Sequence, residues 1–415
     1  MDRAELDRME RMIDREVKAR FLAGTVQRVA LLQPQPDELL VRVFITTEQS
    51  LDAWAQAHRA GMQRMRRELS LELPQARLLE FTIDGAQVIG MPDDPEFTHA
   101  PVPPREAVEI ALSQLRASYV FPDRAEQAAA AIETRLAAGE YDDLDEDTLA
   151  ERLTGQLHET CADKHLRVRT MPPHARREPP RPPEPDRPAW QDRIRPGNYG
   201  IHRVERLDGN VGYLDLRAVA PPEIAGAAIA AAMELVSGTY ALIIDLRRNH
   251  GGSPQGVVFW CSYLFDGPDT HLSDIFDAVT GETRQFWSLA HVPGHRYLGR
   301  PVYVLTSSET FSGGEDLAYT LQAHGRAEVI GETTGGGAHP TRTMPISDTL
   351  AISVPHARSV NPVTGTNWQG TGVVPHVAVP AGQACDVAYA RALRHVLTLT
   401  VPPPIAAEAR AALAS

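Results

Sequence analysis

TFSGGEDLAYTLQAHGRAEVIGETTGGGAHP, residues 310–340, is the most informative segment of this chain. Its apolar side chains recur every three or four positions, which predicts a helix from Gly313 to about His324, with Gly325 as its terminator. The segment 327–330 predicts a strand, and a glycine-rich loop follows it. A helix and a strand in direct succession are typical of an α/β sheet.

Ser312 stands directly before this helix and is followed by two glycines. A serine in that position can be reached by a peptide bond, and the free N–H groups and positive end of the helix can stabilise an oxyanion. The same residues also form an S-x-x-E capping box, in which Ser312 caps the helix and Glu315 reaches back. This fragment alone leaves both interpretations open.

A second informative segment is YALIIDLRRNHGGSP, residues 240–254. Its apolar run at 241–244 predicts a strand of a sheet that is covered on both faces. Gly251 and Gly252 follow in a turn, where the lack of a Cβ lets the backbone approach a ligand and point its N–H groups at it. With the N–H of Gly313 they would form an oxyanion hole. The alternative is a tight turn with no chemical role.

The spacing of breakers and apolar runs divides the chain into four parts. Residues 1–95 predict a small α+β domain of unknown role, with helices at about 2–21 and 50–70 and strands at 24–32, 38–47 and 77–91. Residues 104–170 predict a three-helix bundle, and 171–197 a stiff linker rich in proline and arginine. Residues 198–400 alternate strands and helices, which predicts an α/β core with a mixed sheet.

Composition excludes several classes of partner. The 415 residues carry a net charge of −13, which argues against binding nucleic acid or an anionic membrane. The three cysteines form neither a zinc pattern nor a disulfide framework, and the charged N-terminus has no apolar core of a secretory signal, so we expect a cytoplasmic protein. We expect no cofactor and no metal, and a homo-oligomer stays open.

Several segments lie in the order found in one enzyme family. They are 119–122 (YVFP), 163–166 (DKHL), 245–252 (DLRRNHGG), 310–315 (TFSGGE), 331–340 (GETTGGGAHP) and 370–375 (GTGVVP). Together they resemble the S41 superfamily of serine peptidases, the tail-specific or C-terminal processing proteases, in the branch of the tricorn core and interphotoreceptor retinoid-binding protein. The resemblance covers about residues 103–397 and implies crotonase-like ββα units in the core.

The resemblance also implies which residue is the base. One S41 branch uses a lysine in the glycine-rich loop, but 335–337 contains none. The other branch uses a histidine from the segment before the core, which is His165 here. His339 on the glycine-rich loop is the competing base, and with Asn249 and Glu315 it is expected to line the substrate pocket. A histidine base predicts that the rate falls as the pH drops through about 6–7.

The sequence departs from its relatives near the C-terminus. They commonly carry a glutamate where this chain has Gln369, and an aspartate where it has His376. Gln369 is expected to orient the catalytic residues by hydrogen bonding, but it cannot stabilise an imidazolium by charge. Losing the acid of a triad costs about 10⁴-fold in rate. Glu315 or Asp163 are the candidates to replace it.

We therefore predict a serine peptidase that hydrolyses peptide or protein substrates. Ser312 would be the nucleophile and His165 the base, with water releasing the acyl group. The alternative function is a catalytically weak relative that binds a hydrophobic ligand or peptide in the same cleft, and the neutral Gln369 is what keeps it open. A scaffold organised by residues 1–95 and the proline-rich linker is a third interpretation.

Overall fold

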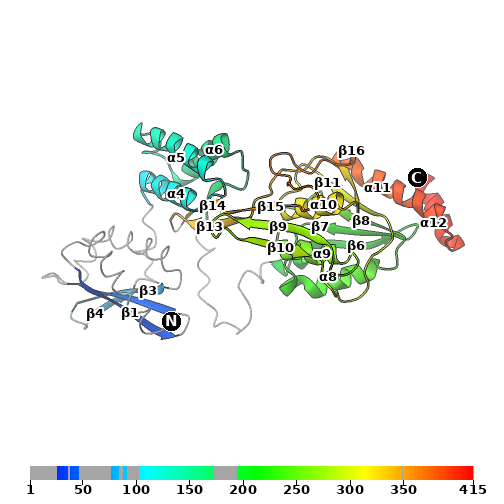
Figure 1. The fold of residues 1–415 in the computed structure, drawn as a ribbon, viewed down its shortest axis with the longest axis horizontal. Helices are drawn as coiled ribbons and strands as arrows, with labels where there is room; N and C mark the ends of the chain where they lie inside the picture. Colours follow the sequence, from blue (N-terminus) through cyan, green and yellow to red (C-terminus); the bar gives the residue numbers. More distant parts are fainter. Residues whose placement is uncertain are drawn as a thin grey trace. The chain divides into compact units, whose positions relative to one another are not determined.

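The computed structural model describes residues 26–35, 38–45, 76–83, 87–90, 102–171, 194–347 and 349–414 (Figure 1). The chain divides into two compact units. The first consists of residues 1–103 with 347–349, and the second of 104–346 with 350–415.

The first unit contains a four-stranded sheet in the order β1-β2-β3-β4. The strands are Val26–Gln35, Glu38–Ile45, Ala76–Ile83 and Gln87–Gly90, and only β2 and β3 run parallel. The single strand predicted at 77–91 is wrong, because β3 and β4 are separate antiparallel strands. The sequence between them contains Asp84–Gly85, a common hairpin signal. The helices predicted at 2–21 and 50–70 lie outside the described residues.

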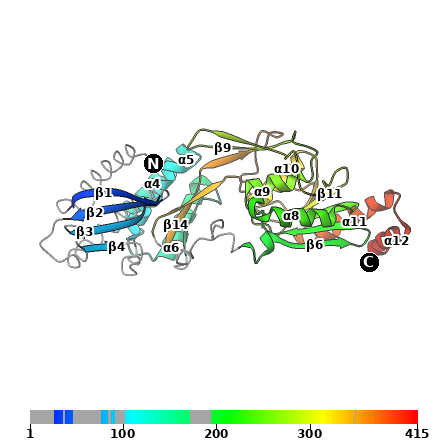
Figure 2. The same ribbon diagram turned by 90° about the horizontal axis from the view of Figure 1, so that it is seen from below.

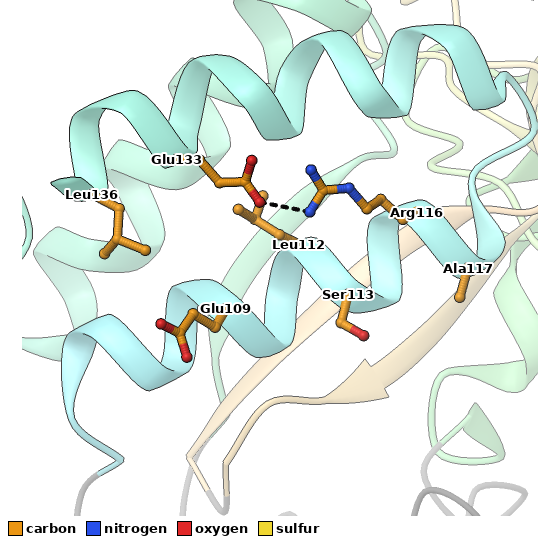
Figure 3. Close-up of a pocket in the computed structure, with 7 residues that line it drawn as sticks. All are labelled: Glu109, Leu112, Ser113, Arg116, Ala117, Glu133 and Leu136. Carbon is orange, nitrogen blue, oxygen red and sulfur yellow. Dashed lines mark hydrogen bonds and ion pairs between the residues drawn. The ribbon is translucent and has the colours of Figure 1, made fainter.

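The second unit begins with three helices, α4 (Pro104–Ser118), α5 (Pro122–Ala137) and α6 (Glu146–Cys161). Each buries one apolar stripe, as the helical period requires. Between α4 and α5 lies a groove of about 640 Å³, where Arg116 donates to Glu133 at 2.7 Å (Figure 3). The N–H of Val120 donates to Pro355 O at 2.8 Å, which ties the α4–α5 turn to the following core.

The core is built on a six-stranded mixed sheet in the order β16-β12-β11-β8-β7-β6. The strands are β6 (Ile201–Leu207), β7 (Val211–Leu216), β8 (Ala241–Asp245), β11 (Val302–Thr306), β12 (Glu328–Gly331) and β16 (Val377–Ala378). The β6–β7 pair is antiparallel and the other pairs are parallel. The mixed sheet agrees with the prediction for this part of the chain.

Both faces of this sheet are covered by helices. Alternate residues of a strand point to opposite faces, and β8 places Leu242 and Ile244 against α8 (Pro222–Val236), α9 (Pro254–Ser262) and α10 (Gly313–Ala323). Its Ala241 and Ile243 face α11 (Ala381–Thr398) and α12 (Pro403–Ala414) on the other side. Because both faces of β8 are covered, its residues 241–244 form a continuous apolar run.

Two three-stranded sheets complete the second unit. Strands β10 (Thr283–Trp287), β9 (His271–Asp277) and β15 (Ala357–Val360) form one. Strands β13 (Thr341–Pro345), β14 (Leu350–Pro355) and β5 (Arg167–Thr170) form the other. Figure 1 shows β13 and β14 between α4–α6 and the main sheet, and Figure 2 shows the same for β14. Because β5 directly follows α6, its pairing with β14 fixes the α6–β5 turn against the core.

The elements predicted around the two informative segments are confirmed. Helix α10 runs over 313–323, against a prediction of 313 to about 324, and β12 begins one residue after its predicted start. Strand β8 matches the prediction and continues through Asp245. Within the described residues, no helix has the length and apolar content needed to cross a bilayer.

Candidate active site

Ser312 lies on a strained turn between β11 and α10. Its backbone angles are φ 53° and ψ −121°, a conformation that glycine adopts readily and that side chains with a Cβ rarely adopt. Strain of this kind persists only where the surroundings enforce it, and it gathers at functional sites. A sharp turn that presents a serine at a helix start is the geometry of a nucleophile elbow.

The capping box predicted for Ser312 and Glu315 is present. The N–H of Ser312 donates to Glu315 Oε2 at 2.8 Å, and the Ser312 side chain faces the backbone N–H of Glu315. The cap alone therefore does not distinguish a structural serine from a nucleophile.

Glu315 is fully buried and holds the glycine-rich loop. Besides the Ser312 N–H, its carboxylate accepts from the N–H groups of Gly336 at 2.6 Å and Gly337 at 2.8 Å, and from the hydroxyl of Thr334. Burial raises the pKa of Glu315, while these four donors act in the opposite direction. Glu315 thus supports the turn, and its complete burial argues against the predicted place in the substrate pocket.

The candidate oxyanion hole differs from the prediction in one amide. The N–H of Gly251 donates to Asn249 Oδ1 at 2.9 Å, so it is not free. Among the described residues, the N–H groups of Gly252 and Gly313 have no acceptor. They lie close together, because a Cβ on Gly313 would sit 2.9 Å from the nitrogen of Gly252. Of the three amides predicted for the oxyanion hole, those of Gly252 and Gly313 are therefore the ones without an acceptor among the described residues.

Asn249 supports both the glycine turn at residues 251–252 and the turn that carries Ser312. Asn249 is fully buried. Its side-chain Nδ2 donates to Leu216 O at 2.9 Å, and its backbone carbonyl oxygen accepts from the Phe311 N–H at 2.9 Å. A Cβ on Gly314 would lie 2.6 Å from its Oδ1, so the packing requires a glycine there. Asn249 therefore supports the serine turn, and its place in the substrate pocket stays a prediction.

His165 lies in the turn between α6 and β5. Its ring packs against Phe311, the residue before Ser312, with ring centroids 4.6 Å apart. On the loop side, a Cβ added to Gly337 would come within 2.7 Å of His165 Cε1. Burial lowers the pKa of His165 to about 4, although the nearby Asp163 acts to raise it. A neutral imidazole next to the serine turn is the state that a general base needs.

His339, the competing base, is buried and bound to an acid. Its Nδ1 lies 2.6 Å from Asp163 Oδ2, and its ring contacts Phe121 edge-on with centroids 5.4 Å apart. The two histidines therefore meet at Asp163, but only the ring of His165 packs against Phe311. The 4% exposure of His339 leaves little of it to line a substrate pocket.

Gln369 holds the glycine-rich loop, as its predicted hydrogen-bonding role requires. Its Oε1 accepts from the Ala338 N–H at 2.8 Å, and the neighbouring Trp368 donates its indole N–H to Gly337 O at 2.8 Å. His376 lies elsewhere: its Nδ1 accepts from the Val329 N–H at 2.9 Å, which ties it to β12. Among the described residues, neither Gln369 nor His376 forms a hydrogen bond with His165 or His339.

Some residues of this site were not singled out from the sequence. Phe311 supports both the His165 ring and the glycine-rich loop, since a Cβ on Gly337 would lie 2.3 Å from its Cζ. Lys164 donates to Gly335 O at 2.7 Å. Their adjacency to Ser312 and His165 in the sequence was the available signal. No group of three or more His, Cys, Asp and Glu able to hold a metal occurs in the described parts of the chain.

Known proteins resemble this chain over part of its length. A chloroplastic carboxyl-terminal-processing peptidase 2 of Arabidopsis thaliana is 29% identical over 175 residues, or 41% of this chain and 32% of that protein. A carboxy-terminal-processing protease of Bartonella bacilliformis is 26% identical over 188 residues, 42% and 40% of the two chains. The solved photosystem II D1 C-terminal processing protease is 26% identical with a TM-score of 0.35, over 41% of this chain and 43% of that one. The chain spans less than half the length of these relatives.

Two family models match consecutive parts of the second unit. Residues 104–194 match the N-terminal domain of Peptidase_S41 in eukaryotic IRBP, a segment that includes His165. Residues 210–379 match peptidase family S41 itself and include the glycine turn, Ser312 and Gln369. The chain belongs to peptidase family S41.

Proposed function

We propose that this chain is a serine peptidase in which Ser312 is the nucleophile and His165 the general base. The observation that carries the proposal is the backbone of Ser312, held at φ 53° at the start of α10 although glycine would be unstrained there. Membership of a peptidase family and the packing of His165 against Phe311 support it.

The reaction follows from the chemistry of these groups. Ser312 Oγ forms a bond to the substrate carbonyl carbon while its proton passes to His165, and the carbonyl π electrons move to the oxygen. When the C–N bond breaks, the amine leaves with that proton. Water then attacks the acyl ester by the same route and releases the acid. The free N–H groups of Gly252 and Gly313 are the donors for the two oxyanions.

The substrates are proposed to be peptides or proteins. The relatives that match this chain are named for carboxyl-terminal processing, and we extend to this chain the cleavage of protein substrates near a C-terminus. A reducing compartment such as the cytoplasm fits the free thiols of Cys161, Cys261 and Cys385. Binding of an apolar ligand without cleavage would not require the strain at Ser312.

The test is hydrolysis of a peptide panel with free and blocked C-termini. Wild type should cleave members of the panel, and Ser312→Ala should lose at least about 10³-fold, the scale on which a removed nucleophile acts. Ser308→Ala is the matched control, because Ser308 is an exposed serine four residues earlier. Full activity in both Ser312→Ala and Ser308→Ala would refute the assignment.

A further inference from the structure

One buried carboxylate lies between the two histidines of the site. Asp163 is 1% exposed, and its two oxygens have different neighbours. Oδ2 is 2.6 Å from His339 Nδ1, whereas Oδ1 accepts the backbone N–H of His165 at 3.0 Å and lies 4.0 Å from that residue's Nδ1. The acid thus already orients one histidine and sits next to the free ring nitrogen of the other.

That ring nitrogen has no partner. His165 Nδ1 is buried and makes no hydrogen bond to any of the described residues. A buried polar atom without a partner is uncommon and asks for an explanation. If His165 accepts the serine proton at Nε2, Nδ1 carries a hydrogen, and this N–H needs an acceptor most when the ring becomes positively charged. Asp163 Oδ1 is the carboxylate oxygen beside it.

Neither the residue at position 369 nor the other titratable groups that act on Asp163 or His165 provide a negative charge for this function. Gln369 is neutral and its Oε1 is bound to the Ala338 N–H. Tyr119 and Cys161 adjoin Asp163, and burial raises the pKa of both, so they are uncharged at neutral pH. Arg167 is positive and lowers the pKa of His165, so it opposes protonation of that ring.

We propose that Asp163 is the acid that positions His165 during catalysis, with His339 holding its second oxygen, in place of the acid missing at position 369. This inference rests on the proposed serine peptidase function. When His165 takes the proton from Ser312 Oγ, its Nδ1–H donates to Asp163 Oδ1, and the carboxylate keeps its charge. His339 donates its Nδ1–H to Oδ2 throughout, so the carboxylate cannot turn away. Both are positioning residues, since neither touches the reacting atoms.

The kinetic test compares Asp163→Asn with Asp143→Asn, an exposed acid in the same three-helix region. Asp163→Asn should lower kcat by about 10²–10⁴-fold, as removal of a triad acid does. The acid limb of its kcat/KM profile should also move to lower pH, because Asp163 raises the pKa of His165. Asp143→Asn should match wild type. A wild-type rate and profile in Asp163→Asn, with Ser312→Ala inactive, would overturn this inference and leave the serine assignment intact.

His339 provides a second, independent comparison. Asn places its Nδ2 at the same distance from the backbone as the Nδ1 of histidine, so it can still donate to Asp163 Oδ2. His339→Ala should therefore lower kcat, and His339→Asn should recover most of that loss. Equal activity of both variants would contradict the positioning role, and so would a His339→Ala enzyme that is as active as wild type.

Imidazole ¹⁵N NMR tests the same arrangement without turnover, in the Ser312→Ala background. At pH 7 His165 should be neutral with its hydrogen on Nδ1, and this tautomer should be lost in Asp163→Asn, while melting temperatures show that both proteins fold. A His165 that carries its hydrogen on Nε2 in the presence of Asp163 would overturn the proposal, whatever the activity measurements give.

Discussion

At the scale of single residues, Ser312 keeps an unfavourable backbone because its neighbours leave it no alternative. A Cβ on Gly251 would lie 2.7 Å from the Ser312 Cβ, and the Ser312 N–H is held by the buried Glu315. Such a conformation costs on the order of 1–3 kcal/mol in a residue with a Cβ. The strain fixes the direction of the Ser312 hydroxyl at the start of α10.

This strain predicts an unusual order of stability at position 312. Glycine normally costs about 0.5–1 kcal/mol through the entropy of the unfolded chain, but at φ 53° it relieves the strain. Ser312→Gly should therefore be at least as stable as Ser312→Ala in urea unfolding, and both should be inactive. A Ser312→Gly variant that is more than about 1 kcal/mol less stable than Ser312→Ala would show that the turn is not strained.

The pH dependence of kcat/KM follows from the burial of His165. Its pKa is lowered to about 4, so the neutral base is present throughout the range above that value. Activity should hold on going from pH 8 to pH 6 and fall only near pH 4–5, rather than through 6–7 as an ordinary histidine would give. A pH profile of kcat/KM in the free enzyme measures this directly. A midpoint near 6.5 would mean that the ring is more hydrated than its 8% exposure indicates.

At the scale of elements, what could be predicted depended on how far apart the contacts are in the sequence. The ends of α10 and β12 follow from local signals at 313–331, such as Gly325 after the last apolar position. The β5–β14 pairing joins residues about 180 positions apart, and it brings Asp163 to His339. No local pattern encodes such a contact, so the sequence named Asp163 only as one of two candidate acids.

The first turn of α10 carries a second buried acid, Asp316, whose hydrogen-bond donor is Thr320 at 3.2 Å. Burial raises its pKa to about 7, far above the value of an unfolded chain near 3.8. The folded state therefore binds the proton more tightly, and stability falls as the pH rises from about 4 to 7. Above pH 7 the charged, buried Asp316 should lower the free energy of unfolding by a few kcal/mol, since one pKa unit corresponds to about 1.4 kcal/mol.

Replacing this acid should make α10 more stable at high pH. Asp316→Asn should raise the free energy of unfolding by about 2–4 kcal/mol at pH 8 and by much less at pH 4, because Asn stays neutral. Urea unfolding at the two pH values measures the difference. Asp386→Asn, an exposed acid on α11, is the control and should change little at either pH. An equal effect of Asp316→Asn at both pH values would contradict the raised pKa.

At the scale of the whole molecule, every residue of the candidate site lies in the second compact unit. The three helices contribute His165 and Asp163 through the α6–β5 turn, and the core contributes the serine, the glycine turn and the glycine-rich loop. The proposed catalytic groups therefore come from both the helical part and the core, and none of them comes from the first unit.

Two truncations separate these contributions. A chain that begins at residue 102 should retain hydrolysis of short peptides within about threefold, since its site is complete. A chain that begins at residue 172 should lose hydrolysis, because it lacks the base and the β5 strand that pairs with β14. Circular dichroism confirms folding of each. Loss of short-peptide hydrolysis in the well-folded longer fragment would show that the first unit contributes to the site.

Fluorophosphonate labelling followed by peptide mass spectrometry shows whether Ser312 is an activated nucleophile. Wild type should give one adduct, located at Ser312. The adduct should be absent in Ser312→Ala and form much more slowly in His165→Ala, and Ser308→Ala should be labelled like wild type. An adduct on another serine, or labelling of Ser312 that does not depend on His165, would contradict this role of Ser312.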